Sequence, residues 1–220
     1  FNDSLADAVI DEGTKILYGR DFYYEEILGL KFQVKAFAFF QTNINAVERL
    51  YSDALNLLPD IHEKTVYDLY CGTGTITQLM ALKAKKVYGV EIVPQAIEDA
   101  KHNAEINEIT NAEFFVGKAE EVLPEYYADY AKEHPGEHAR ADVIVVDPPR
   151  KGCDEKLLQT VIQMEPKRIV YVSCDPATLA RDLKYFGENG YVLKRICPCD
   201  MFGHSYHTET VVCLQRKNMY

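Results

Sequence analysis

The chain has 220 residues, of which 47% are hydrophobic and 26% are charged, a composition typical of a soluble globular protein with one α/β domain and a short appendage. No stretch approaches the roughly 20 apolar residues that a membrane span needs, and no charged-then-apolar leader opens the sequence, so we expect no membrane partner. The formal net charge of -10 argues against strong binding of a phosphate backbone by this chain alone.

The cysteines lie mostly in apolar or motif contexts and form no regular framework, which indicates free thiols in a reducing cytoplasm. They are Cys71, Cys153, Cys174, Cys197, Cys199 and Cys213. No pair has the C-x-x-C spacing of a zinc site, so we expect no metal. Because Phe1 is not an initiator methionine, we expect a fragment of a longer protein.

The first forty residues are predicted to be β-rich. Lys15–Tyr18 and Gly29–Val34 are the candidate strands, and residues 1–40 are interpreted as the remnant of a preceding domain, with the main domain at 41–220. A helix follows, because apolar residues recur at helical spacing from Val47 to Leu58, with Pro59 just past the end.

From residue 65 onward strands and helices alternate, which predicts a mostly parallel sheet covered on both faces. The expected strands are 65–70, 86–91, 112–116, 142–147, 168–173, 190–196 and 209–214. Helices are expected at 75–84, after Pro94, up to about Ala131, and after the fourth and fifth strands, with a turn-rich break at His134–His138. The last two strands have no helix between them and are predicted to be antiparallel. This Rossmann-like, seven-stranded pattern resembles class I S-adenosylmethionine-dependent methyltransferases.

A cofactor loop is predicted where the first strand of the sheet ends. Gly72 and Gly74 allow a tight turn and a close backbone approach to a ligand, and Glu91 ends the next strand, where a carboxylate can accept both hydroxyls of a ribose. A tight turn with a surface glutamate is the plainer interpretation, and NAD is the competing ligand. The Cys-Gly-Thr-Gly order resembles the first motif of methyltransferases.

Asp147-Pro-Pro-Arg150 closes the fourth strand, and Cys174 follows the fifth. Since ligands of open α/β sheets bind beyond the carboxyl ends of the strands, Asp147 is expected to face the cofactor. Asp175 is a predicted N-cap with Pro176 at the first helical position, so Cys174 would feel the helix N-terminus, which favours the thiolate. A buried structural cysteine and an ordinary loop carboxylate are the alternatives.

A thiolate suits methylation of a pyrimidine at carbon 5. Attack at carbon 6 turns carbon 5 into an enolate-like nucleophile, and a base must later remove the carbon 5 proton. Glu209 is the candidate base and His207 the second choice, although a glutamate at the start of a strand is usually just solvated.

Five segments together resemble the RNA (uracil-5-)-methyltransferases, which make 5-methyluridine in ribosomal and transfer RNA. They are Phe40–Asn43, Asp68–Gly74, Asp147–Arg150, Ser173–Asp182 and Asp200–Phe202. The resemblance runs from about Leu17 to the C-terminus, and the run SCDPATLARD is its most specific part. It implies that Cys174 is the nucleophile and Glu209 the base.

The same resemblance implies further partners. Gln41, Tyr70, Glu91 and Asp147 would contact S-adenosylmethionine, together with the glycine loop. The substrate would be RNA, ribosomal (23S) rather than transfer RNA, and the protein a cytoplasmic monomer. An RNA-binding domain, and in some members an iron–sulfur cluster, would precede Phe1.

Two other functions stay open from the sequence. RNA 5-methylcytosine enzymes also carry a cysteine after the fifth strand, but they place a second one directly after Asp-x-Pro, where this chain has Pro149 and Arg150. A methyltransferase-fold binding module without activity is the other alternative. Arg150, Lys151 and Arg181 are the candidates for phosphate contacts.

Overall fold

The structure is a computed structural model that describes residues 15–133, 141–205 and 207–217. Its strands are β1 (Phe22–Ile27), β2 (Leu30–Lys35), β3 (Thr65–Leu69), β4 (Lys86–Glu91), β5 (Ala112–Val116), β6 (Val143–Val146), β7 (Arg168–Ser173), β8 (Tyr191–Cys199) and β9 (Glu209–Arg216). Its helices are α1 (Ile44–Asn56), α2 (Thr75–Ala81), α3 (Pro94–Ile106), α4 (Ala119–Glu133), α5 (Glu155–Gln163) and α6 (Pro176–Glu188). The predicted turn at 134–138 falls outside the described residues.

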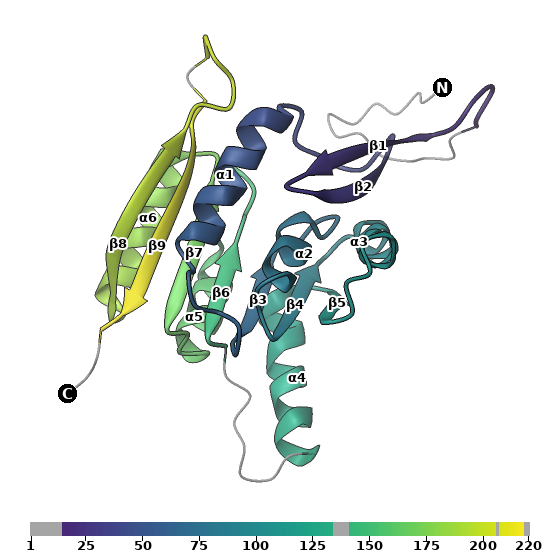
Figure 1. Ribbon diagram of the computed structural model, residues 1–220. Coiled ribbons are helices and arrows are strands. Elements are labelled where there is room, and N and C mark those ends of the chain that lie inside the picture. Colours follow the sequence, from purple (N-terminus) through teal and green to yellow (C-terminus); the bar gives the residue numbers. More distant parts are fainter. Residues whose placement is uncertain (1–14, 134–140, 206, 218–220) are drawn as a thin grey trace.

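Seven strands form one large sheet in the order β5-β4-β3-β6-β7-β9-β8 (Figure 1). Neighbouring strands from β5 to β7 are parallel, while β9 runs antiparallel to both β7 and β8. The predicted α/β class and the antiparallel final pair are therefore confirmed. Since β9 runs antiparallel to β7, its first residue lies at the carboxyl end of β7.

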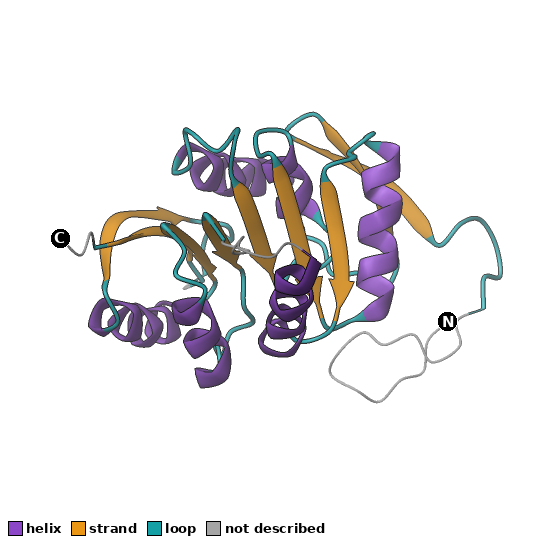
Figure 2. Cartoon of the chain, turned by 90° about the horizontal axis from the view of Figure 1, so that it is seen from below, coloured by secondary structure: helices purple, strands orange, loops and turns teal. Residues whose placement is uncertain are grey.

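Helices cover both faces of the sheet, as the view in Figure 2 shows. Alternate strand residues belong to different cores: Val145 of β6 packs with α1 and α2, whereas Val146 packs with α4, α5 and α6. This period of two is the signature of strands buried on both faces. None of the described helices combines the length and apolarity that crossing a bilayer requires.

The N-terminal strands form a separate hairpin, and one of the two predicted strands is wrong. β2 matches the predicted segment, but Lys15–Tyr18 is not a strand, and β2 pairs instead with Phe22–Ile27. The two-residue turn decides this register, because Leu28 and Gly29 both have positive φ, as the favoured tight hairpin turns require. The turn brings Phe22–Ile27 back along β2, so Lys15–Tyr18 has no strand to pair with.

Asn103 of α3 and Asn107, the C-cap of the same helix, dock this hairpin. Asn103 and Asn107 exchange hydrogen bonds with the backbone of Gln33 and Lys31 respectively, at 2.8–3.3 Å. Four residues of helix rise about 6 Å and two residues of strand about 6.7 Å, so side chains one helical turn apart match alternate residues of a strand edge. The two side-chain amides thereby hydrogen-bond to the edge of β2 that does not pair with β1.

Asn103→Ala should therefore lower the free energy of unfolding by about 1–3 kcal/mol, because Asn103 is buried and its loss leaves the N–H and C=O of Gln33 unpaired. Urea denaturation gives the measurement. Asn56→Ala, at an exposed position of α1, serves as the control and should change stability by less than about 0.5 kcal/mol. Equal effects of the two substitutions would contradict the docking role.

Candidate functional site

Four polar side chains converge at the carboxyl edge of the sheet. Asp68, Asp147 and Cys174 each lie two residues beyond a valine of the core under α1 and α2, and Glu209 lies two residues before one. Because residues two apart in a strand share a face, all four lie on the α1 side of the sheet. Sequence order separates them by up to 141 positions, and the sheet topology brings them to one edge.

Cys174 and Glu209 face each other through the antiparallel pairing of β7 with β9. The last pair in that register is Ser173 with Thr210, so the next position places Cys174 opposite Glu209. Residues directly opposite in antiparallel strands have Cβ atoms about 4.5–5.5 Å apart on the same face. Glu209 is buried and Cys174 is half-buried.

The predicted cap holds the cysteine loop in place. The Asp175 carboxylate accepts hydrogen bonds from the backbone N–H groups of Ala177 and Thr178, at 2.8 and 3.1 Å. The Ser173 hydroxyl donates to the Asp175 carbonyl and accepts from the Asp175 N–H, which tightens the turn around Cys174. The hydrogen bonds from the N–H groups of Thr178 and Ala177 lower the pKa of Asp175.

The helix N-terminus was expected to favour the Cys174 thiolate, but in the protein without ligands the pKa of this thiol is raised. Burial raises the pKa of the Cys174 thiol, and the nearby carboxylates of Glu209 and Asp147 raise it further. The guanidinium of Arg150 acts in the opposite direction. Burial likewise raises the pKa of Glu209, and Arg150 again opposes the shift. Arg150 is thus the cation shared by the thiol and the acid.

Two further carboxyls at this edge have raised pKa values. Burial raises the pKa of Asp68 to about 7 and that of Asp147 to about 8, the second helped by Glu209 and Asp68. Asp68 accepts a 2.6 Å hydrogen bond from the Thr77 hydroxyl through Oδ2, while its Oδ1 is buried with no hydrogen-bond partner among the described residues. A buried unpaired carboxylate oxygen is costly, so this edge is suited to a cationic ligand.

Tyr51 of α1 belongs to the same site, although sequence reasoning assigned it only to the helix's apolar face. Burial raises the pKa of Tyr51 well above its usual range, with further contributions from Asp147, Asp68 and Glu209. The phenol therefore lies near three carboxyls. A polar tip on an otherwise apolar helix face was the only sequence signal, and tyrosine is common in cores.

The glycine loop has the predicted backbone. Gly72 and Gly74 have φ of 53° and 81°, and a Cβ at Gly74 would lie 2.9 Å from the Ala100 side chain. Glu91 turns toward this loop, since its carboxylate accepts from the N–H groups of Gly72 at 3.2 Å and Val93 at 3.0 Å. The non-glycine Tyr70 also has positive φ, at 74°, and follows β3 directly. The glycines, Tyr70 and Glu91 thus form one unit at the ends of β3 and β4.

The segment containing Gln41 is fixed near the loop before β9. Asn43 caps α1 by accepting from the Ala46 N–H at 3.2 Å and donates at 2.9 Å to the carbonyl of Met201. Two motifs separated by 158 residues are thereby joined. Gln41, two residues before this bond, is half-buried.

His207 and the three candidate phosphate contacts divide into different roles. Arg150 Nη2 lies 3.3 Å from Nδ1 of His207, on the exposed side of the site. Arg181 bonds to Asp182 and to the carbonyls of Lys151 and Cys153, although its side chain is also exposed. Arg150 and Lys151 keep exposed side chains.

Comparison with known proteins identifies the family to which the chain belongs. Residues 9–217 match the family model described as tRNA (uracil-5-)-methyltransferase. An uncharacterised RNA methyltransferase of Bacillus cereus is 50% identical over 215 residues, which are 98% of this chain and 45% of that protein. One of Caldanaerobacter subterraneus is 47% identical over 98% of this chain and 46% of its own length. The chain thus spans less than half the length of these relatives.

Solved structures agree with the fold. The crystal structure of Pyrococcus abyssi tRNA (uracil-54, C5)-methyltransferase in complex with S-adenosyl-L-homocysteine matches with a TM-score of 0.72 and 32% identity, over 90% of this chain and 45% of that one. M. jannaschii TYW2 in complex with AdoMet matches at 0.61, over 92% of this chain and 90% of that one, but at 17% identity it shows the fold alone.

The buried carboxyls predict a pH-dependent cost to stability. The unfolded chain releases the Asp68 proton near pH 4 and the folded chain only near pH 7, so stability falls as pH rises through that window. Asp68→Asn should abolish this loss and be more stable than the parent at pH 8 by roughly 1–4 kcal/mol, with the difference shrinking towards pH 4.

Urea denaturation at the two pH values measures the difference, and Asp60→Asn at an exposed position is the matched control. A gain for Asp68→Asn that is the same at both pH values would contradict a protonation cause.

Proposed function

The chain belongs to the family described as tRNA (uracil-5-)-methyltransferase, and from this premise we propose that it transfers a methyl group from S-adenosylmethionine to carbon 5 of a uridine in RNA. The observation that carries the proposal is the placement of Cys174 opposite Glu209 at the edge where Asp147 ends β6. A thiol, an acid and a cofactor-facing carboxyl on one face are the groups that this reaction requires.

The residues at the edge fit S-adenosylmethionine, which supplies an electrophilic methyl group when bound. Its sulfonium and ammonium are both cationic, and the edge offers Asp147 with a raised pKa and Asp68 with an unpaired buried oxygen. Glu91 would hold the ribose hydroxyls, since its carboxylate already lies beside the Gly72 N–H. Tyr70, Gly74 and Gln41 complete the proposed cofactor set.

Cys174 is the proposed nucleophile. Its sulfur forms a bond to carbon 6 of the uracil ring, and the electron pair of the carbon 5–carbon 6 double bond becomes an enolate that makes carbon 5 nucleophilic. Because the raised pKa of the thiol works against the thiolate, positive charge must assist, and Arg150 already lowers that pKa. The cationic sulfonium brought by the cofactor would act in the same direction.

Glu209 is the proposed base. Once carbon 5 carries the methyl group, the carboxylate takes the carbon 5 proton, the double bond re-forms, and the Cys174 thiolate leaves carbon 6. Burial raises the pKa of Glu209, which makes it a stronger proton acceptor than an exposed glutamate. His207, whose Nδ1 lies 3.3 Å from Arg150 Nη2, stays the second choice.

The environment of Cys153 supports uridine over cytidine. A 5-methylcytosine mechanism needs a second reactive cysteine near the loop after β6, and Cys153 is the nearest one. Its backbone N–H donates to Asp182 and its side chain is buried against Tyr171 on the other face of the sheet, while burial raises its pKa to about 12. It is therefore unsuited to be the second nucleophile.

Ribosomal RNA is the proposed substrate class, and transfer RNA is the second candidate, supported by the Pyrococcus abyssi enzyme. The net charge of -10 supports the view that other parts of a longer protein contribute most RNA contacts, with residues 1–40 as the end of a preceding domain and 41–220 as the catalytic domain. A cytoplasmic monomer completes the proposal. Nucleoside analysis of separated ribosomal and transfer RNA from cells lacking the full-length gene distinguishes the two substrates.

Cofactor binding gives the first prediction from this function. Glu91→Ala should weaken S-adenosylmethionine binding by about 10- to 100-fold, because two hydrogen bonds from the ribose to a carboxylate are lost. Isothermal titration calorimetry measures the affinity, and Glu98→Ala, at an exposed position of α3, is the control that should bind normally. Undiminished binding by Glu91→Ala would show that the ribose lies elsewhere.

The second prediction from this function concerns the separate roles of the Cys174 thiol and the Glu209 carboxylate. In the full-length protein, Cys174→Ala should abolish methyl transfer and leave cofactor affinity nearly unchanged, since the thiol acts on the base and not on the cofactor. Glu209→Gln should add and methylate but fail to eliminate, so a covalent protein–RNA complex should accumulate. A slow band on a denaturing gel reports it, and the band should require both cofactor and Cys174.

Cys197→Ala, at a half-buried position of the edge strand β8, is the matched cysteine control and should retain full activity. Normal turnover by Glu209→Gln without a trapped band would assign the proton transfer to another group, with His207 tested next by the same gel.

A further inference from the structure

The end of the most specific sequence motif has no part in the proposed reaction. Arg181 and Asp182 close the run that begins at Ser173, yet both lie in the second turn of α6. Asp182 is fully buried, and it contacts Tyr171, whose side chain lies on the face of β7 opposite to that of Cys174. These residues therefore lie on the face of the sheet opposite to the candidate site.

Asp182 joins three elements through its carboxylate. Oδ2 accepts from the backbone N–H of Cys153 at 2.9 Å and from the Tyr171 hydroxyl at 2.7 Å, and Oδ1 accepts from Arg181 Nε at 2.8 Å. Helix α6, strand β7 and the loop after β6 thus meet at one buried carboxylate. A buried charge is tolerated when its oxygens are paired in this way.

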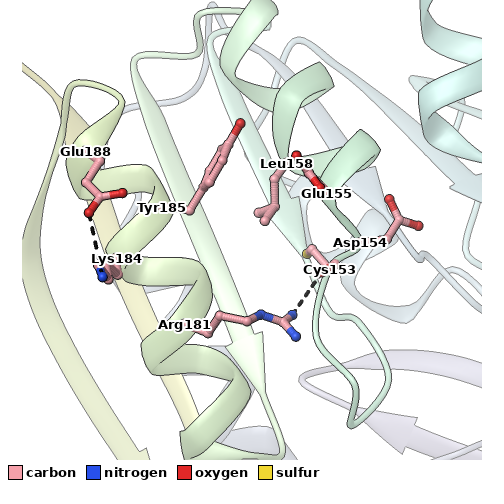
Figure 3. A pocket seen from close by; sticks show the side chains of 8 residues that line it. All are labelled: Cys153, Asp154, Glu155, Leu158, Arg181, Lys184, Tyr185 and Glu188. Carbon is pink, nitrogen blue, oxygen red and sulfur yellow. Dashed lines mark hydrogen bonds and ion pairs between the residues drawn. The ribbon is translucent and has the colours of Figure 1, made fainter.

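Arg181 extends the same connection to the loop backbone. Its Nη2 donates to the carbonyls of Lys151 and Cys153, both at 3.0 Å. Figure 3 shows its side chain reaching from α6 across to Cys153, along one side of the pocket between α5 and α6. The rigid, planar guanidinium suits this task, since it serves a carboxylate and two carbonyls at once.

The loop is shaped to receive these groups. Thr178 donates its hydroxyl to the Arg150 carbonyl at 3.0 Å, one turn before Arg181. Gly152 has φ of 73°, and a Cβ there would lie 2.6 Å from Arg181 Nη2 and 2.7 Å from Asp182 Oδ2. Every residue from Arg150 to Cys153 is therefore in direct contact with α6 or leaves room for it.

The loop positions one important side chain, that of Arg150. Its backbone is fixed by Thr178, while its guanidinium reaches His207 and is the cation that acts on both Cys174 and Glu209. Asp147 lies three residues earlier on the same loop. A displacement of about 1 Å in such a group is enough to lower the rate of a catalysed reaction strongly.

We propose that Arg181 and Asp182 are positioning residues that clamp the Arg150–Cys153 loop to α6 and thereby hold the Arg150 guanidinium beside Cys174 and Glu209. The role in methyl transfer rests on the proposed function, whereas the clamp itself is a property of the fold. Cys174 lies directly before the N-cap of α6 and the clamp lies in the second turn of the same helix, so α6 supports both the proposed nucleophile and the loop.

The test compares Arg181→Ala, Arg181→Lys and Thr178→Val in the full-length protein. Methyl transfer to total RNA from cells lacking the gene gives kcat and the KM for S-adenosylmethionine. Iodoacetamide alkylation against pH, with the Cys174 peptide followed by mass spectrometry, gives the pKa of that thiol without any need for activity. Arg216→Ala is the matched control, because Arg216 is an arginine paired with Glu165 at the opposite end of the sheet.

Arg181→Ala should lower kcat by about 10- to 100-fold with KM changed less than twofold, and should raise the pKa of Cys174 as Arg150 moves away. Thr178→Val should act in the same direction but less, Arg181→Lys should recover part of the loss, and Arg216→Ala should match the parent. Arg181→Ala leaves the buried Asp182 carboxylate without its cationic partner and can fail to fold, in which case Thr178→Val decides.

Parental kcat and an unchanged alkylation profile in folded Arg181→Ala, or in Thr178→Val when Arg181→Ala does not fold, would overturn the clamp. A parent protein that methylates no RNA would refute the proposed function instead. The alkylation profiles would still decide on the clamp in that case.

Discussion

The antiparallel insertion of β9 between β7 and β8 is the constraint on which the site depends. Parallel strands all present their carboxyl ends at one edge, but β9 presents its first residue there, so Glu209 lies opposite Cys174. A parallel β9 would place Glu209 at the far end of the sheet. The loop between β8 and β9 also follows from this arrangement, and its Met201 carbonyl ties the edge to the cap of α1.

The cost of this arrangement is a concentration of acidic groups in a poorly solvated place. Asp68, Asp147 and Glu209 all have raised pKa values, and Tyr51 and Cys174 are affected by the same charges. Groups placed for function in this way reduce stability, and the apolar layers on both faces of the sheet must offset the loss. Cationic ligands relieve the same repulsion, which links binding to stability.

Motifs and long-range contacts differ in what a sequence reveals about them. The alternation of strands and helices, the glycine loop and the N-cap at Asp175 are local, so they were predicted at nearly the observed residues, and the family match confirms the resemblance of the motifs. The strand at Lys15–Tyr18 was wrong, because strand formation depends on a partner and the Leu28–Gly29 turn selects Phe22–Ile27. The hydrogen bonds of Arg181 to the loop after β6 were not predicted, since a local sequence does not show which backbone carbonyls an arginine reaches.

The sequence alone therefore determined the fold class and the family, and it provided the candidates for the cofactor loop and the thiol, because each is encoded by residues a few positions apart. Only the tertiary structure decided the environment of these groups. It showed that burial and two carboxylates raise the pKa of Cys174 despite its place before a helix, and that Arg150 opposes the shift. It also joined Asp182 to Cys153, 29 positions away. Electrostatic fields and buried hydrogen bonds act through space, so they depend on distances that only the folded chain defines.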